Sequence, residues 1–506
     1  MFEAAELGRK ISKKEFDAIE PELHTRLLQV QQQLKDSNTS VIIIVSGVEG
    51  AGKGEVVNRL SEWLDTRDIQ TNAFWDETDE QRLRPDYWRF WRTLPARGSI
   101  GIMFGSWYTK PIIDRVFGKL DDGDFDQALR RITTFERLLV NDGTLIVKLW
   151  FHLPKKVVEK QLKKDQAIME MKIKKSPLLE KFSKQYDQFA SISERAIRIT
   201  DKGNSPWHLI ESTDRRYRDI TVGQTLLNAM EARLGNSDQD NTEEPEPPVT
   251  HLADDLPANK LTILDHVDLS RSLDVKKYEA DLKHYQGRLF DLAWQAHNAK
   301  KSVVAVFEGW DASGKGGAIR RVTRAIDARL YKVISTAAPS DEEKAHQYLW
   351  RFWRHVPLAG YFTLYDRSWY GRVLVERVEN FARQEEWQRA YSEINHFEEQ
   401  LCEHGIVLVK FWIHLDQDEQ LRRFKEREKT PWKMHKITEE DWRNREKWHD
   451  YKAAVNDMVA HSSTEFAPWT LVSGNDKKVA RVEILQTLCE AIEGQLPSDG
   501  KTSGKT

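Results

Sequence analysis

The sequence predicts an α/β chain of two tandem domains, each a parallel sheet covered by helices. Two observations carry this prediction. The segment WRFWRTLP begins at Trp88 and the segment WRFWRHVP begins at Trp350, an offset of 350 − 88 = 262 residues. Within each copy, continuous apolar runs alternate with helical stretches, which is the pattern of strands buried on both sides of a parallel sheet.

The same offset recurs along most of the chain, so the repeat covers whole domains. It pairs Lys53 with Lys315, Ser106–Tyr108 with Ser368–Tyr370, Lys148 with Lys410, and Pro206-Trp207 with Pro468-Trp469. We place the first domain at residues 1–234 and the second at 261–496. Residues 235–260 are rich in acidic residues and proline and predict a flexible linker. Residues 497–506 predict a disordered tail.

Composition excludes several classes of protein. The chain of 506 residues has a formal net charge of −3, which argues against a nucleic-acid partner bound through overall positive charge. Its two cysteines, Cys402 and Cys489, have no paired spacing and fit a reducing compartment. No segment has the apolar length of a signal peptide or of a membrane span. We therefore expect a cytoplasmic protein without a membrane partner.

Each copy gives the same order of elements. The second copy begins with a helix over 278–297, for which the first copy has 16–34. A run of β-branched residues follows, VVAVFEG in the second copy and VIIIVSG in the first, and leads into a glycine-rich loop. After this loop we expect a helix over 318–327 and then strands separated by helices, with the sequences YKVIST, YFTLYD, IVLVKFWIHL and PWTLVS.

The glycine loop of the second copy predicts a phosphate site. It reads GWDASGKGG from Gly309 to Gly317, with Gly314 and Lys315 at the spacing of a Walker A loop. Glycines let backbone amides face an anion, and the N-terminus of the next helix adds partial positive charge. We expect the glycines, Gly316 included, to line the phosphates and Lys315 to reach the terminal ones. A tight turn without a ligand is the alternative.

Two aspartates are the candidate metal ligands. Gly316 stands where a Walker A loop normally has the Ser or Thr that ligates magnesium. Asp311 lies inside the loop, and Asp366 ends the strand YFTLYD, where an acidic residue of the Walker B type would lie. Two carboxylates suit Mg2+, which takes few protein ligands and keeps waters and phosphate oxygens. The alternatives are a turn-forming role for Asp311 and a cap for Asp366.

Arg367 and Arg372 follow Asp366 in the segment DRSWYGR. An arginine fork binds phosphate oxygens through two parallel hydrogen bonds, so we expect these side chains at the phosphates. An ion pair to Asp366 or Glu376 is the simpler interpretation.

A basic segment from Leu421 to Trp448 follows the strand IVLVKFWIHL. In P-loop kinases this position carries the helical lid that closes over the phosphates, and charge neutralisation there requires Arg and Lys. The alternative is a solvated helix face held by i,i+4 pairs. The candidate phosphate-binding cations of this segment are Arg423, Arg427, Lys433 and Lys436.

The helix after the loop adds further positive charge. Arg320, Arg321 and Arg324, together with Arg351 and Arg354, would form a basic track longer than a nucleotide needs. This length favours a polyanion as the phosphoryl donor.

The first copy lacks the acid at the strand end. At the register of Asp366–Arg367 it has Phe104–Gly105, and Glu49 replaces the loop aspartate, although Lys53 is kept. Without the strand-end carboxylate no second metal ligand is evident. We therefore interpret the first domain as a degenerate structural partner and the second as the catalytic domain.

The motifs taken together resemble the second family of polyphosphate kinases. They are GWDASGKGGAIRRV, YLWRFWRHVP, YDRSWYGRVLVERV, KFWIHL, RRFKEREKTPWKMHKITEEDWRNREKWHDY and APWTLV, and the resemblance covers almost the whole chain. It implies an α/β fold of two tandem P-loop kinase-like domains, each with a helical lid. The site residues that it implies are Asp311, Lys315, Asp366, Arg367, Arg423 and Arg427, with the two aspartates as metal ligands.

The activity implied by this resemblance is Mg2+-dependent transfer of the terminal phosphoryl group of inorganic polyphosphate to AMP, giving ADP. Mn2+ is expected to substitute for Mg2+, and the reverse reaction stays open. The expected partners are polyphosphate and AMP or ADP, and a homo-oligomer stays open. The alternatives are polyphosphate-dependent phosphorylation of ADP or GDP, an ATP-dependent nucleotide kinase, and a non-catalytic polyanion-binding protein.

Overall fold

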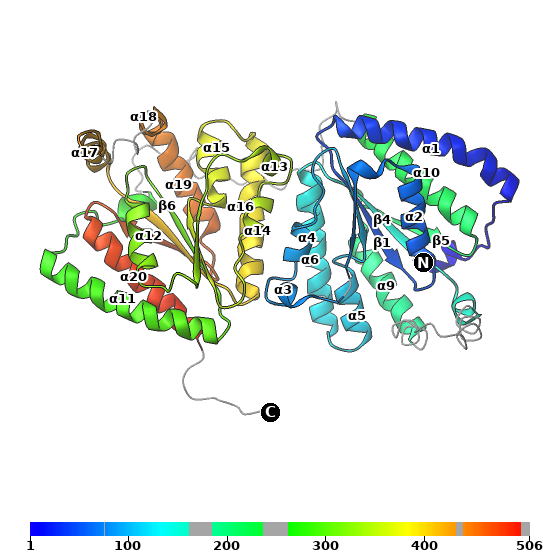
Figure 1. Ribbon diagram of the computed structural model, residues 1–506, viewed down its shortest axis with the longest axis horizontal. Coiled ribbons are helices and arrows are strands. Elements are labelled where there is room, and N and C mark those ends of the chain that lie inside the picture. The colour runs from blue at the N-terminus through cyan, green and yellow to red at the C-terminus, as the bar shows by residue number, and fades with distance from the viewer. Residues whose placement is uncertain (75, 161–184, 236–261, 432–438, 497–506) are drawn as a thin grey trace. The chain divides into compact units, whose positions relative to one another are not determined.

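The computed structural model describes residues 1–74, 76–160, 185–235, 262–431 and 439–496 (Figure 1). Contacts within the chain divide it into two compact units. The first holds the described parts of Met1–Glu77, Arg89–Thr242 and Ser340–Trp350, and the second holds those of Thr78–Trp88, Glu243–Pro339 and Arg351–Thr506. The expected linker, apart from Gly235, and the expected tail at 497–506 lie outside the described residues.

The sheet of the second domain has five parallel strands in the order β10-β9-β6-β8-β7. They are β6 (Val303–Gly309), β7 (Tyr331–Ser335), β8 (Phe362–Asp366), β9 (Val407–His414) and β10 (Trp469–Ser473). The central strand β6 pairs Phe307 with Asp366 on β8 and with Phe411 on β9. The carboxyl ends of these strands therefore meet at the edge where the loop after β6 begins, which is where open α/β sheets bind ligands.

Helices cover both faces of this sheet, and Figure 1 shows α11 and α20 side by side on one of them. This layer consists of α11 (Val275–Asn298), α12 (Lys315–Thr323) and α20 (Lys477–Gln495), which share one buried apolar core with the central strands. A second layer contains α16 (Gln384–Glu403) and α19 (Trp448–Ser462). There Phe397 packs edge-on against Trp353 and Trp369, so the tryptophans of WRFWR and SWY belong to the core.

The first domain repeats this architecture with the strand order β2-β3-β1-β4-β5, again all parallel. Its strands are β1 (Val41–Gly47), β2 (Ile69–Ala73), β3 (Ile100–Phe104), β4 (Leu145–His152) and β5 (Trp207–Glu211). Its longer helices are α1 (Lys13–Lys35), α2 (Lys53–Trp63), α6 (Asp122–Asn141), α9 (Tyr186–Thr200) and α10 (Arg215–Gly235). The predicted fold class is therefore confirmed for both copies.

Shorter helices connect these elements. In chain order they are η1 (Phe2–Ala5), η2 (Thr66–Asp68), α3 (Asp79–Arg82), α4 (Trp88–Trp91), α5 (Thr109–Val116), η3 (Ile263–His266), α13 (Asp341–Lys344), α14 (Trp350–Trp353), η4 (Trp369–Val373), α15 (Val375–Val378), α17 (Gln417–Glu428) and α18 (Glu439–Glu446). Within the part of the chain that the structure describes, none of the helices combines the length and apolar character that a membrane crossing requires.

The structure corrects two predictions, the bounds of one helix and the burial of one strand. The helix predicted over 318–327 is α12, which begins already at Lys315 and ends at Thr323. It starts earlier because the glycines after the lysine adopt helical geometry at the loop's end. The strand β7 was expected to be covered on both faces, but Lys332 and Val333 are exposed. As the edge strand of the sheet, β7 has only one neighbour.

Each domain buries the same lysine–glutamate network. In the second domain Nζ of Lys410 donates to Glu398 at 2.7 Å, to the Tyr370 hydroxyl at 2.9 Å and to the carbonyl of Ser462 at 2.6 Å. Both charged side chains are fully buried, so each requires the other. Trp369 and Tyr370 also donate to Glu398. The network therefore fastens the turn after β8 to the sheet and to α16. Lys148 and Glu136 make the equivalent pair in the first domain.

Candidate active site

The phosphate loop joins β6 to α12 and depends on backbone conformations with positive φ. Gly309 has a φ of 151°, and a Cβ there would come 2.6 Å from the carbonyl oxygen of Ile413 on β9, so only glycine fits. Gly314 has a φ of 111°, and Ala312 reaches 63° although it carries a side chain. The loop delivers the chain into α12, whose N-terminus favours an anion. Its geometry is that of a phosphate-binding loop.

Lys315 opens α12, and its ammonium folds back over the loop. Nζ donates to the carbonyl oxygens of Gly309 at 2.6 Å and Trp310 at 3.2 Å. Burial lowers the pKa of Lys315, and the negative charge of Asp311 opposes that shift. The other charges that act on this lysine come from Arg367, Asp366 and Glu308. The expected lysine, arginine and aspartates therefore share one site.

Asp311 is held from three directions. Its Oδ1 accepts a hydrogen bond from Arg367 at 3.1 Å, and its Oδ2 accepts one from the Asn444 amide at 2.9 Å. Its main-chain oxygen accepts a third from the amide of Gln420 at 3.2 Å. A side chain that is 13% exposed and fixed in this way presents its carboxylate in one orientation.

Asp366 ends β8 beside the start of α12. Its Oδ2 lies 4.0 Å from the position that a Cβ on Gly316 would take, so the carboxylate faces the helix N-terminus. In the described residues, no cluster of three or more His, Cys, Asp or Glu side chains forms a metal cage. Asp311 and Asp366 beside a glycine-lined loop fit Mg2+, which completes its octahedron with water and phosphate oxygens.

Arg367 and Arg372 take different partners. Arg367 has a φ of 63°, which is uncommon for a residue with a side chain. Its guanidinium lies 3.1 Å from Asp311 and 3.8 Å from Glu440, and its side chain is 44% exposed. Arg372 instead forms an ion pair with Glu376 at 3.1 Å. Arg372 therefore makes the ion pair to Glu376 that was the simpler interpretation, and its contact with phosphate stays a prediction, whereas Arg367 faces the loop aspartate.

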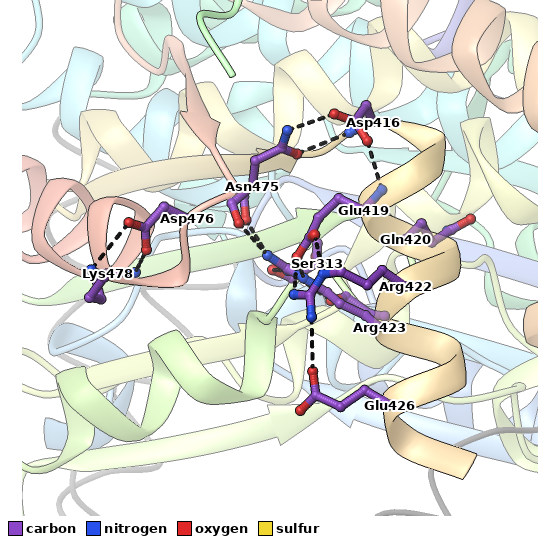
Figure 2. A network of polar contacts seen from close by, with 12 residues as sticks. Ser313, Asp416, Glu419, Gln420, Arg422, Arg423, Glu426, Asn475, Asp476 and Lys478 are labelled. Atoms are coloured by element: carbon purple, nitrogen blue, oxygen red, sulfur yellow. Dashed lines mark hydrogen bonds and ion pairs between the residues drawn. The ribbon is translucent and has the colours of Figure 1, made fainter. Parts of the chain in front are cut away.

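Arg423 lies beneath the loop rather than on an exposed face of the lid. It belongs to α17 and is 2% exposed. Figure 2 shows Arg423 within the network of polar contacts that includes Ser313, Glu419 and Asn475. Its three nitrogens donate over 2.6 to 3.0 Å to the carbonyl oxygens of Ala312, Ser313, Gly474 and Asn475 and to the carboxylate of Glu419. In this position Arg423 supports the backbone of the phosphate loop.

Four further cations were expected at the phosphates: Arg320, Arg427, Lys433 and Lys436. Burial lowers the pKa of Arg423 and the contact with Glu419 opposes this shift, while the charges of Arg422 and Arg427, which lie on the same helix α17, add to it. Arg320 is exposed on α12. The other two expected cations, Lys433 and Lys436, lie outside the described residues.

Glu308 is a site residue that the sequence interpretation missed. It is 5% exposed, and its Oε1 accepts a hydrogen bond from the Ser368 hydroxyl at 2.8 Å. Burial raises the pKa of Glu308, and the charge of Lys315 opposes this rise. The signal was available, because the first copy has Ser46 at the same register (308 − 262 = 46). An acid that is present in only one of the two copies is a candidate functional residue.

Asn444 was also missed, although it stands in the segment WRNREKW that the first copy lacks. Its contact with Asp311 joins residues 133 positions apart in the chain. No local pattern predicts such a contact, so only the difference between the two copies could have indicated this residue.

The first copy keeps its lysine and gives it one additional partner. Nζ of Lys53 donates to the carbonyl oxygens of Gly47 at 2.8 Å and Val48 at 3.1 Å, as Lys315 does in its own loop. In addition it forms an ion pair with Glu49 at 3.1 Å. The carboxylate of Glu49 therefore offsets the positive charge of Lys53 within the loop.

The loop of the first copy also has a different support. Arg218 on α10 is 3% exposed and donates to the carbonyl oxygen of Ala51 at 3.4 Å. Ala51 is the counterpart of Ser313 (51 + 262 = 313), whose carbonyl oxygen is held by Arg423 in the second copy. The counterpart of Arg218 is Ala480. Each copy thus holds the same carbonyl with an arginine from a different helix.

Comparison with known proteins agrees with this geometry. The family model described as Polyphosphate kinase 2 (PPK2) matches residues 10–238 and 272–500. A polyphosphate:AMP phosphotransferase from Pseudomonas aeruginosa is 48% identical over 99% of this chain and 100% of its own. Another from Acinetobacter johnsonii is 37% identical over 95% of this chain and 98% of its own. A crystal structure of a polyphosphate kinase 2 from Pseudomonas aeruginosa is similar with a TM-score of 0.88 and 47% identity, and covers 99% of this chain and 100% of its own.

Proposed function

Because the chain belongs to the polyphosphate kinase 2 family in both of its domains, we propose that it transfers the terminal phosphoryl group of inorganic polyphosphate to AMP, giving ADP. The observation that carries this proposal is the similarity over nearly the full length to two polyphosphate:AMP phosphotransferases. The second domain supports it with a phosphate loop whose lysine, arginine and aspartates act on one another. We assign the chemistry to this domain.

The reaction needs alignment and positive charge more than covalent chemistry. An oxygen of the AMP phosphate attacks the terminal phosphorus of polyphosphate. The bond from this phosphorus to its bridging oxygen breaks, and that oxygen keeps the electron pair as the new chain end. The attacking phosphate is already an anion at neutral pH, so no base has to remove a proton. The protein then has to hold the two anions in line and offset the charge on the transferred group.

The proposed roles follow from position. The loop amides and Lys315 hold the terminal phosphates of the donor, and Arg367 offsets the charge that develops on the transferred group. Arg423 acts through the loop that it supports. The longer polyphosphate chain is expected to be contacted by Arg320, Arg427, Lys433 and Lys436.

Asp311 and Asp366 would hold Mg2+, or Mn2+ in its place. When bound, the ion supplies charge neutralisation and orients phosphate oxygens. Arg367 shares Oδ1 of Asp311, and each carboxylate oxygen has a second lone pair, so the arginine and the ion do not exclude each other.

The direct experiment offers purified full-length protein two donors and several acceptors. Long-chain polyphosphate or ATP is combined with AMP, ADP or GDP in the presence of Mg2+, and the nucleotides are resolved by chromatography. We expect ADP from polyphosphate and AMP, at a higher rate than with ATP as donor. A higher rate with ATP would indicate a nucleotide kinase, a preference for ADP or GDP would indicate a triphosphate-forming enzyme, and binding without turnover would indicate a polyanion-binding protein.

We also propose a cytoplasmic location. Cys402 and Cys489 are both free thiols, which supports a reducing compartment. Cell fractionation that released the protein with periplasmic markers would contradict this placement.

A further inference from the structure

The helix α18 places Asn444 against the carboxylate of Asp311. Nδ2 of Asn444 donates to Oδ2 of Asp311 at 2.9 Å, and the hydroxyl of Tyr451 donates to Oδ1 of Asn444 at 3.1 Å. We propose that Asn444 is a positioning residue that sets the Asp311 carboxylate from the lid side of the site. Metal binding at the phosphate loop then depends on the contact between Asn444 of α18 and Asp311. This inference rests on the proposed function, because it takes Asp311 as a metal ligand.

Tyr451 fixes which end of the amide faces the aspartate. An asparagine side chain has a donor end and an acceptor end, and a hydroxyl donor at Oδ1 leaves the NH2 group for Asp311. Burial raises the pKa of Tyr451, and the charge of Glu379 adds to the rise, so the hydroxyl keeps its proton and stays a donor. The hydrogen bonds therefore run in one direction, from the Tyr451 hydroxyl to Asn444 and from the Asn444 amide to Asp311.

A neutral donor suits a carboxylate that has to bind a cation. Arg367 at Oδ1 offsets part of the charge of Asp311, whereas Asn444 at Oδ2 orients the carboxylate without adding positive charge. Hydrogen bonds of this kind to a ligating carboxylate tune metal affinity, and their loss typically costs about 10- to 100-fold in affinity or activity.

The lid side is attached to the loop by more than this bond. Trp448, the first residue of α19, stacks on Trp310 of the loop with ring centroids 3.8 Å apart and an interplanar angle of 8°. Trp310 also donates from Nε1 to His414 at 3.0 Å. Trp442 of α18 packs edge-on against Phe424 of α17 at 5.1 Å. These contacts seat α18 at a defined distance from the loop, which a positioning role requires.

The first copy lacks both hydrogen-bond donors of this network. At the offset of 262 residues, Phe189 replaces Tyr451 and Phe182, outside the described residues, replaces Asn444. Glu49 replaces the aspartate itself. A purely architectural contact would be expected in both copies, as the buried lysine–glutamate network is. Its restriction to the catalytic copy supports a role in the chemistry.

The test compares Asn444→Ala, Tyr451→Phe and the double variant with Glu446→Ala, an exposed position on the same helix. Mn2+ binding to the full-length protein is measured by electron paramagnetic resonance, independently of turnover. The Mg2+ dependence of the rate and the KM for AMP are measured in parallel, with melting temperatures as the control for folding.

We expect Asn444→Ala to weaken Mn2+ binding and to raise the Mg2+ concentration at half-maximal rate, each by about 10-fold or more, with little change in the KM for AMP. Tyr451→Phe should change the Mn2+ affinity and the Mg2+ concentration at half-maximal rate in the same direction, but by a smaller factor. The double variant should have the same Mn2+ affinity and Mg2+ dependence as Asn444→Ala, because Tyr451 acts through Asn444.

Normal Mn2+ affinity in a folded Asn444→Ala protein would overturn the proposal. So would an equal loss in Glu446→Ala, since any change in α18 would then suffice. Additive losses in the double variant would contradict the order Tyr451–Asn444–Asp311. A wild-type chain that binds Mn2+ but turns over neither polyphosphate nor AMP would contradict the proposed function alone, and the Mn2+ measurement would still decide the role of Asn444.

Discussion

Glu308 is a carboxyl group buried beside the cations of the phosphate site. Burial raises its pKa above the ordinary value of 4.5, and the charge of Lys315 opposes this rise without cancelling it. The folded state therefore binds this proton more tightly than the unfolded chain does. The stability that the group contributes is complete below its unfolded pKa and is lost as pH rises through the higher folded pKa. At neutral pH an ionised Glu308 thus lowers the free energy of unfolding.

Glu308→Gln tests this balance, because the amide keeps an acceptor for Ser368 and removes the charge. At about pH 8 we expect the melting temperature of the variant to equal or exceed that of the wild type. Between about pH 5 and pH 8 the melting temperature of the variant should fall by less than that of the wild type. Its kcat should be lower, because Lys315 loses a compensating charge. Calorimetry at the two pH values and steady-state kinetics check both expectations. A variant that is less stable than the wild type at the higher pH would contradict the sign of the pKa shift.

The two aspartates allow a second prediction at this scale. Asp311→Asn and Asp366→Asn each remove a charged ligand oxygen, so we expect kcat to fall by about 100-fold or more, which corresponds to a few kcal/mol of lost charge stabilisation. Melting curves establish that the variants are folded. Near-normal turnover of either variant at ordinary Mg2+ would show that its aspartate is no metal ligand.

At the scale of the element, α17 carries the support of the loop. Arg423 engages four backbone carbonyl oxygens and Glu419, and breaking such a buried charged contact costs about 3 kcal/mol. Arg423→Lys cannot make all of these bonds, so we expect a lower melting temperature together with a lower kcat. The matched control is Arg422→Ala, because Arg422 forms ion pairs with Glu419 and Glu426 at the exposed surface. That change should cost less than about 1 kcal/mol.

The same experiment separates two roles for Arg423. A lid arginine that binds phosphate would lose activity in Arg423→Lys without losing stability. Unfolding of both proteins by denaturant, measured alongside kcat, distinguishes the two outcomes.

Local patterns were enough to predict the central strand and the phosphate loop of each copy from the sequence. The strand VVAVFEG and the glycine loop are each encoded within a few residues, so β6 and the phosphate loop could be read directly. The position of Arg423 under the loop could not be predicted, because the sequence of a run of Arg and Lys does not show which side chain points to solvent and which is buried. Its partners lie as far as 111 positions away. Glu308 and Asn444 depend on such distant contacts too, and only the difference between the copies marks them.

At the scale of the whole molecule, the two copies give the sharpest comparison. Lys315→Ala should lower kcat by at least about 100-fold, because a charge that faces the phosphates is lost at the transition state. Lys53→Ala should leave kcat nearly unchanged, because Lys53 is already paired with Glu49. Kinetics and melting temperatures of both variants are measured on the full chain. A folded Lys53→Ala protein as inactive as Lys315→Ala would show that the first loop is coupled to catalysis, and the degenerate-partner interpretation would fail.

The arginine under each loop has a consequence for engineering. In the second copy the support of the loop comes from α17, so a substitution at Arg423 on this helix would also disturb the phosphate loop. In the first copy Arg218 holds the equivalent carbonyl from α10, in the core of the domain. The support of the first loop therefore comes from a helix that follows β5, and that of the second loop from a helix that follows β9. Returning Asp and Arg to positions 104 and 105 would therefore leave the first copy without an arginine at the register of Arg423, where its sequence has Gln161.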